Sequence, residues 1–193
     1  MAGRRQFDEK QTLEQVLDVF WRQGYGATSM ADLAVATGVQ RGSLYHAYRD
    51  KEALFLRVFQ DYRDAFLADA AVRLSHPDPR RALLDFFDFT IESLAVGTPA
   101  RGCLSTRTAL DTRAGAEAIR TELRDLLDGL ERVLAERLSQ DGTEDLLAVP
   151  PAEAARLLVT LTRGNVVIES VYQDPSRLRA AARTLVDLIV PTG

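Results

Sequence analysis

The sequence predicts an all-α protein of about nine helices. Apolar residues recur at intervals of three and four along most of the chain, which is the spacing of one helix face. Glycine and proline separate these stretches, and the sequence shows no convincing strand pattern and no internal repeat. With 193 residues, of which 46% are hydrophobic and 27% charged, the chain is long enough to bury a substantial core.

Four helices are expected before residue 76. The first ends at a pair of glycines and has one apolar face, which consists of Leu13, Val16, Leu17, Phe20 and Trp21. Thr28 or Ser29 offers an N-cap for a short second helix, and Gly38 ends that helix. A third short helix covers about 40–48, and Asp50 caps a long fourth one.

The rest of the chain also divides into helices separated by breaks. The two prolines within residues 76–79 disfavour helix in the residue before each of them. The helix that follows is apolar nearly all round, as a helix buried inside a body should be. Pro150 and Pro151 open a later helix, because proline is well suited to the first helical turn. The expected helices are about 80–95, 103–112, 116–138, 151–172 and 176–189.

Residue usage excludes several classes of protein. Cys103 is the single cysteine, so no intramolecular disulfide is possible, and His46 and His76 lack the companions of a metal site. No phosphate loop and no Ser/Cys–His–Asp spacing is present, so we expect no catalytic residue, no cofactor and no enzymatic activity. The sequence shows no signal peptide and no apolar run near the roughly 18 residues of a spanning helix. The expectation is a soluble cytoplasmic protein without membrane contact.

The charge is divided unevenly along the chain. The net charge is −4, but residues 1–60 hold eight basic and seven acidic side chains, which gives +1, and residues 61–193 hold 16 and 21, which gives −5. A small nucleic-acid-contacting head on an acidic body would show this division, and so would an ordinary drift of charge.

The segment 30–49 has the pattern of two short helices joined by a tight turn. Ala34 is small where the helices cross, Gly38 permits the backbone angle of the turn, and Val39 and Leu44 fill the wedge between the helices. The second helix exposes residue types that reach base edges and phosphates, namely Gln40, Arg41, Ser43, Tyr45 and His46. The spacing alone is also compatible with an ordinary corner between two helices.

Four stretches of this region closely resemble the TetR/AcrR family of tetracycline-repressor-like regulators. They are GATSMADLA at 26–34, GV at 38–39, GSLYH at 42–46 and KEAL at 51–54, and the match covers about residues 7–60. The chain departs from the family at Ala47 and Tyr48, where a larger polar residue and phenylalanine are usual. The resemblance implies a helix-turn-helix DNA-binding domain over 1–50, with the motif at about 30–49, and a helical ligand-binding and dimerisation domain over 51–193.

The resemblance also assigns residues to DNA contacts. Thr28, Tyr45, His46 and Lys51 would contact phosphates, and Gln40, Arg41 and Ser43 would face the major groove. Gly42 would let the helix approach closely, and Ser29 completes the predicted DNA-binding set.

The body is expected to pair with a second copy and to bind an effector. A single helix-turn-helix makes few contacts, so such proteins usually dimerise. The predicted dimer interface lies on the last two helices at Leu157, Leu161, Ile168, Leu178, Leu185 and Ile189. The predicted ligand-binding residues are Phe66, Phe86, Phe87, Phe89, Cys103 and Tyr172, for an apolar or aromatic small molecule. Both sets would also suit an intramolecular core.

The sequence is therefore interpreted as a homodimeric repressor that binds a palindromic operator in double-stranded DNA and is released by a small molecule. Two alternatives remain open at this stage. Cys103 could sense oxidants or electrophiles, with Arg101 and Arg107 favouring its thiolate. A helical interaction module that has lost DNA binding would also fit the near-neutral head.

Overall fold

The computed structural model describes residues 8–95, 102–111, 117–140 and 142–191. Within these ranges it contains nine α-helices and one short 3₁₀-helix, η1 (Glu144–Leu146), and no strand. The predicted all-α class is confirmed. The chain divides into two compact units, one formed by Met1–Tyr62 with Arg107–Leu123 and the other by Arg63–Thr106 with Arg124–Gly193.

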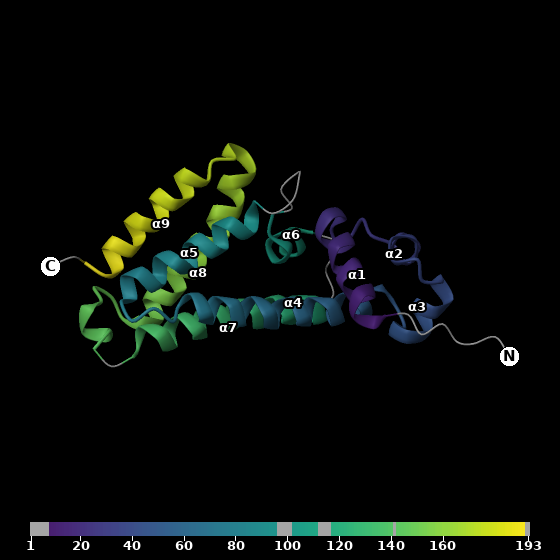
Figure 1. Ribbon diagram of the computed structural model, residues 1–193, viewed down its shortest axis with the longest axis horizontal. Helices are drawn as coiled ribbons and strands as arrows, with labels where there is room; N and C mark the ends of the chain where they lie inside the picture. The colour runs from purple at the N-terminus through teal and green to yellow at the C-terminus, as the bar shows by residue number, and fades with distance from the viewer. Residues whose placement is uncertain (1–7, 96–101, 112–116, 141, 192–193) are drawn as a thin grey trace. The chain divides into compact units, whose positions relative to one another are not determined.

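The first unit contains α1 (Glu9–Gln23), α2 (Met30–Thr37), α3 (Arg41–Tyr48) and the beginning of α4 (Lys51–Arg73) (Figure 1). Its core is aromatic. Phe20 of α1 meets Phe55 of α4 edge-on, with ring centroids 5.0 Å apart, and Phe55 stacks on Phe59 at 5.4 Å. All three rings are fully buried. Burial of such large side chains is what holds α1 and α4 together.

Side-chain caps fix where these helices begin. Asp8 accepts a hydrogen bond from the Gln11 N–H at the start of α1, and Asp50 accepts one from the Ala53 N–H at the start of α4. Such caps satisfy amide groups that have no partner inside the helix. The predicted cap at Asp50 is confirmed.

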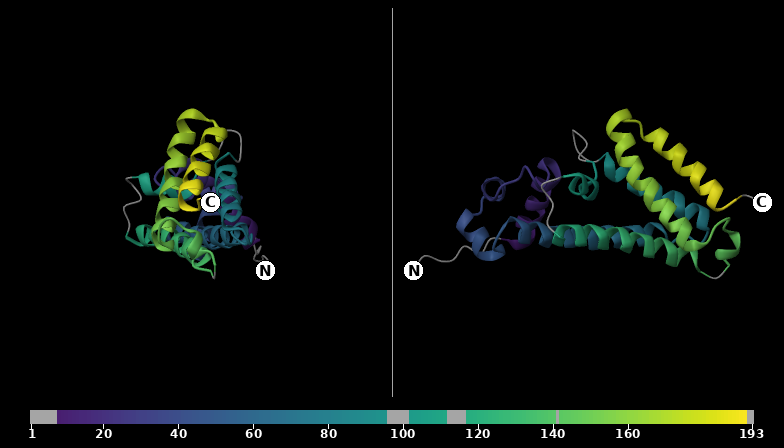
Figure 2. Two further views of the ribbon diagram at one scale, coloured as in Figure 1. Left: turned by 90° about the vertical axis from the view of Figure 1, so that its left-hand side faces the viewer. Right: turned by 180° about the vertical axis from the view of Figure 1, so that it is seen from behind.

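The second unit is built around α5 (Pro79–Leu94), α8 (Pro151–Tyr172) and α9 (Pro175–Ile189), which pack on one another (Figures 1 and 2). α6 (Leu104–Leu110) and α7 (Glu117–Leu138) each contribute residues to both units. The core of the second unit includes Phe86 and Phe87 of α5, both fully buried. α5 therefore buries one broad face, but Arg81 and Glu92 are exposed, so the helix is not covered all round as its composition predicts.

One buried arginine fastens the connection between α4 and α5. Arg137 of α7 is 6% exposed, and its guanidinium donates to the carbonyl oxygens of Leu74 (3.0 Å), His76 (2.8 Å) and Pro77 (2.9 Å). It also donates to Thr143 Oγ1 at 3.2 Å. A guanidinium has five N–H donors in a fixed fork, so one side chain can satisfy several carbonyls of an irregular segment.

The described part of the chain contains neither a membrane-spanning helix nor a metal-binding cluster. None of the helices is long and apolar enough to cross a membrane. No group of three or more His, Cys, Asp or Glu side chains in the described ranges could hold a metal ion.

Candidate nucleic-acid interface

The turn between α2 and α3 is tight and internally bonded. Gly38 ends α2 in the left-handed conformation, with φ 65°, which glycine adopts without steric cost. Thr37 Oγ1 donates to the Leu33 carbonyl (2.7 Å) and accepts from the Val39 N–H (3.3 Å). The turn therefore holds α3 at a fixed angle to α2, as the spacing of 30–49 predicts.

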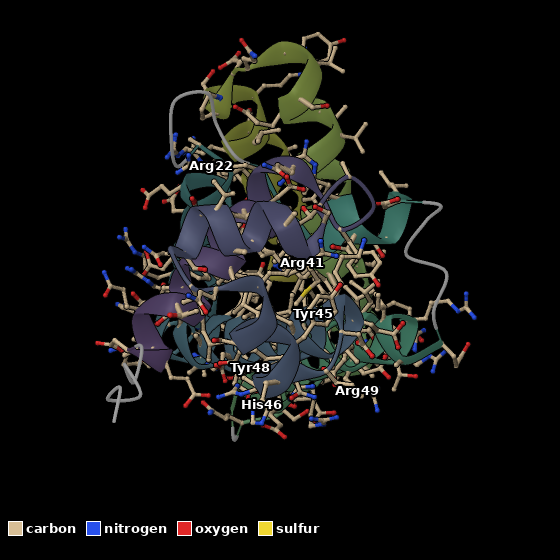
Figure 3. All side chains as sticks on the ribbon, turned by 90° about the vertical axis from the view of Figure 1, so that its right-hand side faces the viewer. Arg22, Arg41, Tyr45, His46, Tyr48 and Arg49 are labelled. Atoms are coloured by element: carbon tan, nitrogen blue, oxygen red, sulfur yellow. The ribbon has the colours of Figure 1, made fainter. Side chains whose placement is uncertain are left out.

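α3 buries one side of itself and exposes the other. Leu44 is fully buried, and its exposed neighbours in sequence are six of the predicted DNA-binding residues: Gln40, Arg41, Gly42, Ser43, Tyr45 and His46. Figure 3 looks onto this face, with Arg41, Tyr45 and His46 labelled. The structure thus brings together the part of the predicted set that lies on α3.

Arg41 is held on the exposed face by Tyr45, one helical turn further on. Its guanidinium donates to the Tyr45 hydroxyl at 3.3 Å and lies 5.4 Å from the centre of the Tyr45 ring. Arg49, at the end of the same helix, instead pairs with Asp50 at 3.0 Å. Among the described carboxylates, none forms an ion pair with Arg41. Because no described carboxylate pairs with it, the Arg41 guanidinium is suited to donating hydrogen bonds to an external anion or to the edge of a base.

The predicted residues outside α3 are placed differently. Thr28 is 2% exposed, and its hydroxyl donates to the Gly24 carbonyl at 2.7 Å. Its side chain belongs to the interior of the α1–α2 turn, which leaves little of it open to the phosphate contact that the resemblance implies. Ser29 is exposed and forms a capping box with Asp32: Ser29 Oγ accepts from the Asp32 N–H, and the Ser29 N–H donates to the Asp32 carboxylate. The Ser29 hydroxyl also donates to Asp32 Oδ2 at 2.6 Å, and this bond, together with the one from the Ser29 N–H, lowers the pKa of the Asp32 carboxyl.

Lys51 holds the turn between α1 and α2 in place. Its ammonium donates to the carbonyl oxygens of Tyr25 (2.9 Å) and Thr28 (3.0 Å) and lies 4.2 Å from the centre of the Tyr25 ring. The first residue of α4 thereby holds the segment that precedes α2. The contacts give Lys51 a structural role in addition to the phosphate contact that the resemblance implies.

Two residues far along the chain, which no local pattern connects with this region, also hold the end of α1 and the segment after it. Arg107 Nη1 donates to the carbonyl oxygens of Trp21 (2.7 Å) and Arg22 (2.9 Å), and Asp111 accepts from the Gly26 N–H. Arg107 thus satisfies helix-terminal carbonyls that have no partner within α1. Arg107 was expected to favour the thiolate of Cys103, and its actual contacts are these carbonyls of the first unit.

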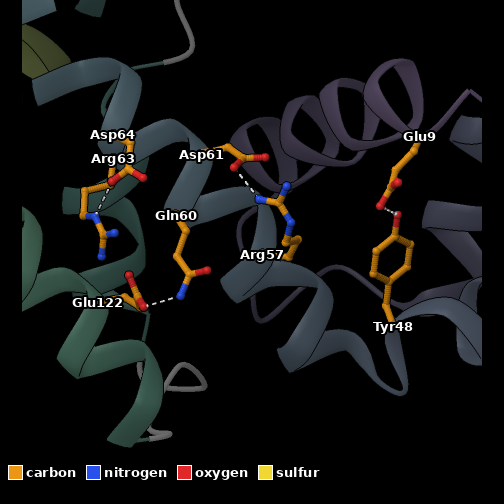
Figure 4. Close-up of polar contacts among 8 residues, drawn as sticks. All are labelled: Glu9, Tyr48, Arg57, Gln60, Asp61, Arg63, Asp64 and Glu122. Carbon is orange, nitrogen blue, oxygen red and sulfur yellow. Dashed lines mark hydrogen bonds and ion pairs between the residues drawn. The ribbon is translucent and has the colours of Figure 1, made fainter. Parts of the chain in front are cut away.

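Tyr48 connects α3 to α1. Its hydroxyl donates to Glu9 Oε1 at 3.3 Å (Figure 4). Burial and the neighbouring Glu9 carboxylate raise the pKa of Tyr48. Within the same unit, Gln60 of α4 donates to Glu122 of α7 at 2.6 Å (Figure 4). The end of α3 and the middle of α4 are therefore tied to neighbouring helices by side-chain bonds.

A hollow of about 590 Å³ opens beside the C-terminal half of α3. It is lined by Tyr45, His46, Ala47, Tyr48, Arg49, Ala53 and Arg57. Ala47, one of the two positions at which the chain departs from the family pattern, lies in this hollow, where a larger side chain would occupy part of the space.

The six predicted ligand-binding residues do not share one environment. Phe86 and Phe87 are fully buried core residues, and Tyr172 is 53% exposed at the end of α8, beneath the Arg177 guanidinium at 4.2 Å. Phe66 and Phe89 are partly buried and form a pair with ring centroids 5.5 Å apart. Phe66 and Phe89 therefore keep part of their surface uncovered, whereas Phe86 and Phe87 do not.

Cys103 lies beside Arg163 of α8. The Arg163 guanidinium donates to Cys103 Sγ at 3.5 Å and to Ser105 Oγ at 2.9 Å, and Cys103 Sγ and Ser105 Oγ are 3.1 Å apart. Burial raises the pKa of the Cys103 thiol, but the Arg163 guanidinium and the hydrogen bonds from Ser105 and Thr106 together outweigh it, so the net pKa lies below its usual value. Arg101, which was expected near this thiol, lies outside the described residues. Arg163 was missed because it is 60 residues away.

The predicted interface residues are also divided. Leu157 and Ile168 are 48% and 37% exposed on α8, and Leu161 and Leu185 are half-buried. Leu178 and Ile189 are buried in the core of the second unit of a single chain, because they face α5 and α8 within the fold. These two residues pack inside one protomer and do not offer an exposed surface to a partner.

The fold and this site define a helix-turn-helix protein with a separate helical unit, and the comparisons with known proteins give the family. Residues 13–58 match the family described as bacterial regulatory proteins, tetR family. Residues 79–184 match the transcriptional regulator LmrA/YxaF-like C-terminal domain. The chain belongs to the TetR family of bacterial transcriptional regulators.

Individual relatives agree with this assignment. The transcriptional repressor ComR of Escherichia coli K12 is 39% identical over 83 residues, which are 42% of this chain and 40% of ComR. The regulator YezE of Bacillus subtilis 168 is 30% identical over 58% of each chain. The chain thus spans about half the length of the curated relatives it matches. A cysteine mutant of the TetR-family regulator CifR, solved with a 26-base-pair operator DNA, superposes with a TM-score of 0.86 at 26% identity, over 97% of this chain and 100% of CifR.

The role of Lys51 can be tested by Lys51→Met. Two carbonyls lose a charged donor, so we expect the free energy of unfolding to fall by about 2 kcal/mol in urea denaturation. Lys10→Met, on the exposed side of α1, is the matched control and should change little. An unchanged stability of Lys51→Met, together with a salt slope of DNA binding reduced by about one, would show that Lys51 only contacts phosphate.

Proposed function

We propose that this protein is a homodimeric repressor that reads an operator through α3 and leaves it when a small molecule binds the second unit. The observation that carries the proposal is the exposed face of α3 with Arg41 projecting from it, in a chain of the TetR family. ComR is itself a repressor, and CifR was solved on operator DNA, which supports the same role here. The purified protein should bind DNA from upstream of its own gene in the presence of scrambled competitor.

The division of labour on α3 follows from side-chain chemistry. Gln40, Arg41 and Ser43 lie at the N-terminal end of the helix, the end that enters the major groove in helix-turn-helix proteins. Arg41 is suited to guanine and Gln40 to adenine, whereas Tyr45 and His46 are suited to phosphates. Gly42 carries no side chain that would keep the helix away from the groove, and space is open around it.

In a homodimer, α3 of the second protomer would bind the other half of the operator. The outer face of α8 and α9 carries exposed apolar side chains at helical spacing, which are Leu157, Val167, Ile168, Val171 and Leu188. Gly164 lies on the same face of α8, and an added Cβ there would meet no atom within 4 Å. An apolar face with a small residue at its centre favours close packing of a second helix. Leu161 and Leu185, half-buried, would lie at the edge of this interface.

The remaining functional assignments follow from DNA binding. We propose a binding protein without enzymatic activity, since the chain's family regulates transcription. Its compartment is the cytoplasm, where a bacterial operator is found. Among the predicted ligand residues, we retain Phe66, Phe89 and Cys103 as the ones a small molecule could meet.

A second candidate function, thiol-based sensing through Cys103, is favoured by the contact with Arg163. The thiolate is the reactive form of cysteine, and a guanidinium 3.5 Å from the sulfur stabilises it. Modification of Cys103 would then replace ligand binding as the signal that lowers operator affinity. The DNA-binding part of the proposal is the same in both cases.

Arg41→Ala should weaken operator binding by about 1–3 kcal/mol, because a guanidinium that reads a base edge is lost. The preference at one base pair should relax at the same time. Titration against a panel of single-base operator variants measures both effects. Arg22→Ala, an exposed arginine paired with Asp18 on α1, serves as the control. Equal weakening on every sequence would contradict base reading and indicate a phosphate contact.

Ile168→Asp should raise the dimer dissociation constant by about a hundredfold, since a charge buried at an apolar interface costs ~3 kcal/mol. Analytical ultracentrifugation over a range of protein concentrations measures the change. Val72→Asp replaces a more exposed valine on α4, 68% against 37% for Ile168, and should leave the dimer intact. If both variants remain dimeric, the face that contains Ile168 is not the interface.

Arg163→Leu should shift the pH profile of Cys103 alkylation to higher pH. Removal of the guanidinium raises the pKa of the thiol, so less thiolate is present at any pH below that value. The rate of iodoacetamide labelling, followed by mass spectrometry, gives the profile. Arg156→Leu, on the exposed side of the same helix, is the control. The sensing role is contradicted if operator release by an electrophile is the same in Cys103→Ser and in the unaltered protein.

A further inference from the structure

Two polar side chains on the buried side of α8 have atoms without a hydrogen-bond partner. Asn165 is 3% exposed, and its Nδ2 has no partner in the described part of the chain. Glu169 Oε2 is likewise buried and lacks a partner among the described residues. The two residues are four positions apart, so their side chains lie one above the other on one helix face.

The same face continues through residues that belong to the interior. Leu158 and Thr162 precede Asn165 at intervals of four and three, and both are buried. Gly164 and Ile168, by contrast, lie on the exposed face. Leu161 and Ile168 of the proposed interface lie four residues before and three residues after Asn165, but Asn165 is already buried within a single chain, so a partner protomer docked there would have little access to its Nδ2.

Other polar side chains of α8 do have partners. Thr160, Thr162 and Ser170 each donate to a carbonyl of their own helix, and Arg163 donates to Ser105. Buried polar groups in folded proteins are hydrogen-bonded as a rule, because an unpaired one costs free energy. The two exceptions on α8 stand one turn apart, which is the arrangement expected where a bound molecule supplies the missing partners.

We propose that Asn165 and Glu169 bind the polar group of the small-molecule effector, and that this group offers an acceptor and a donor side by side, as a carboxamide does. This inference rests on the proposed function, since it names the chemistry of the effector of the second unit. The Asn165 amide N–H would donate to the carbonyl oxygen of the ligand. The ligand's N–H would donate to the Glu169 carboxylate.

Asn165 and Glu169 together would bind other polar groups of a ligand less well than a carboxamide. A carboxylate would accept from Asn165 but would lie against the carboxylate of Glu169, and like charges repel. An amidinium would pair with Glu169 but would leave Asn165 Nδ2 facing a donor. The rest of the second unit is apolar around its core, so the effector is an apolar molecule with one carboxamide-like group and not a purely hydrophobic one.

Three probes of equal shape separate these possibilities: benzamide, benzamidine and benzoate. Binding to the full chain is measured by ligand-observed NMR, without DNA. We expect benzamide to bind at least about tenfold more tightly than the other two, the factor that corresponds to ~1.4 kcal/mol. In Asn165→Asp both side chains accept, so the preference should pass to benzamidine. Glu153→Gln, at the exposed start of α8, should keep the preference for benzamide.

If Asn165→Asp does not fold, Asn165→Leu provides a second test of the carboxamide site. It should lose the preference for benzamide, and its thermal midpoint without ligand should be equal to or above that of the unaltered protein. Polar groups kept for binding cost stability, and their removal restores it. A structural role, for example through a buried water, would instead lower the midpoint.

The inference is overturned if none of the three probes binds, if all bind equally, or if Asn165→Leu lowers the thermal midpoint. Operator binding of the unaltered protein is measured separately in the absence of probes. Loss of operator binding would refute the proposed repressor and leave the probe result intact. A failed probe series with normal operator binding would refute only the carboxamide site.

Discussion

The first unit depends on one constraint: α2 and α3 are each eight residues long, too short to be stable as isolated helices. They are stable in the protein because they pack against the rest of the unit. Leu33 and Leu44 are fully buried, one from each helix, and the aromatic core of α1 and α4 lies in the same unit. A short helix with one buried anchor leaves the rest of its surface free to bind, and on α3 that surface carries the residues expected to read DNA.

Polar contacts supply the precision that one buried leucine cannot. Lys51, Arg107 and Asp111 all bind backbone groups at the end of α1 or in the segment that leads to α2. Each satisfies a carbonyl or an amide that no helix satisfies, so the irregular segment is held without regular secondary structure. The position of α2, and through the Gly38 turn that of α3, therefore depends on side chains that never touch the exposed face.

Local signals in the sequence predicted much of this molecule. The cap at Asp50, the left-handed Gly38 and the apolar spacing of α1, α5, α8 and α9 each act within a few residues, and so they can be read from the sequence. Contacts between distant segments could not be read. Arg163 beside Cys103 and Arg107 at Trp21 join positions 60 and 86 residues apart, and no spacing rule links such pairs.

The apolar spacing in the sequence also did not show which of these side chains are buried. The apolar positions of α9 and α5 look alike in the sequence, yet Leu178, Ile189, Phe86 and Phe87 are core residues, and Leu188 is 67% exposed. The spacing of apolar residues shows which of them share a helix face. It does not show whether another element covers that face. Asn165 did carry a signal, since a polar residue at an apolar position of a helix is either paired or functional.

α8 carries the residues on which each proposal for the second unit rests. Its outer face exposes the apolar side chains of the proposed interface, its buried face holds Asn165 and Glu169, and Arg163 reaches Cys103. A ligand can lower operator affinity only by as much as it prefers one conformation over another. Since a helix moves as one body, a shift of α8 on ligand binding also moves the outer face on which the second protomer would pack. The same helix would then link effector, thiol and dimer, and the preference of the ligand for one position of α8 would set how strongly the operator is released.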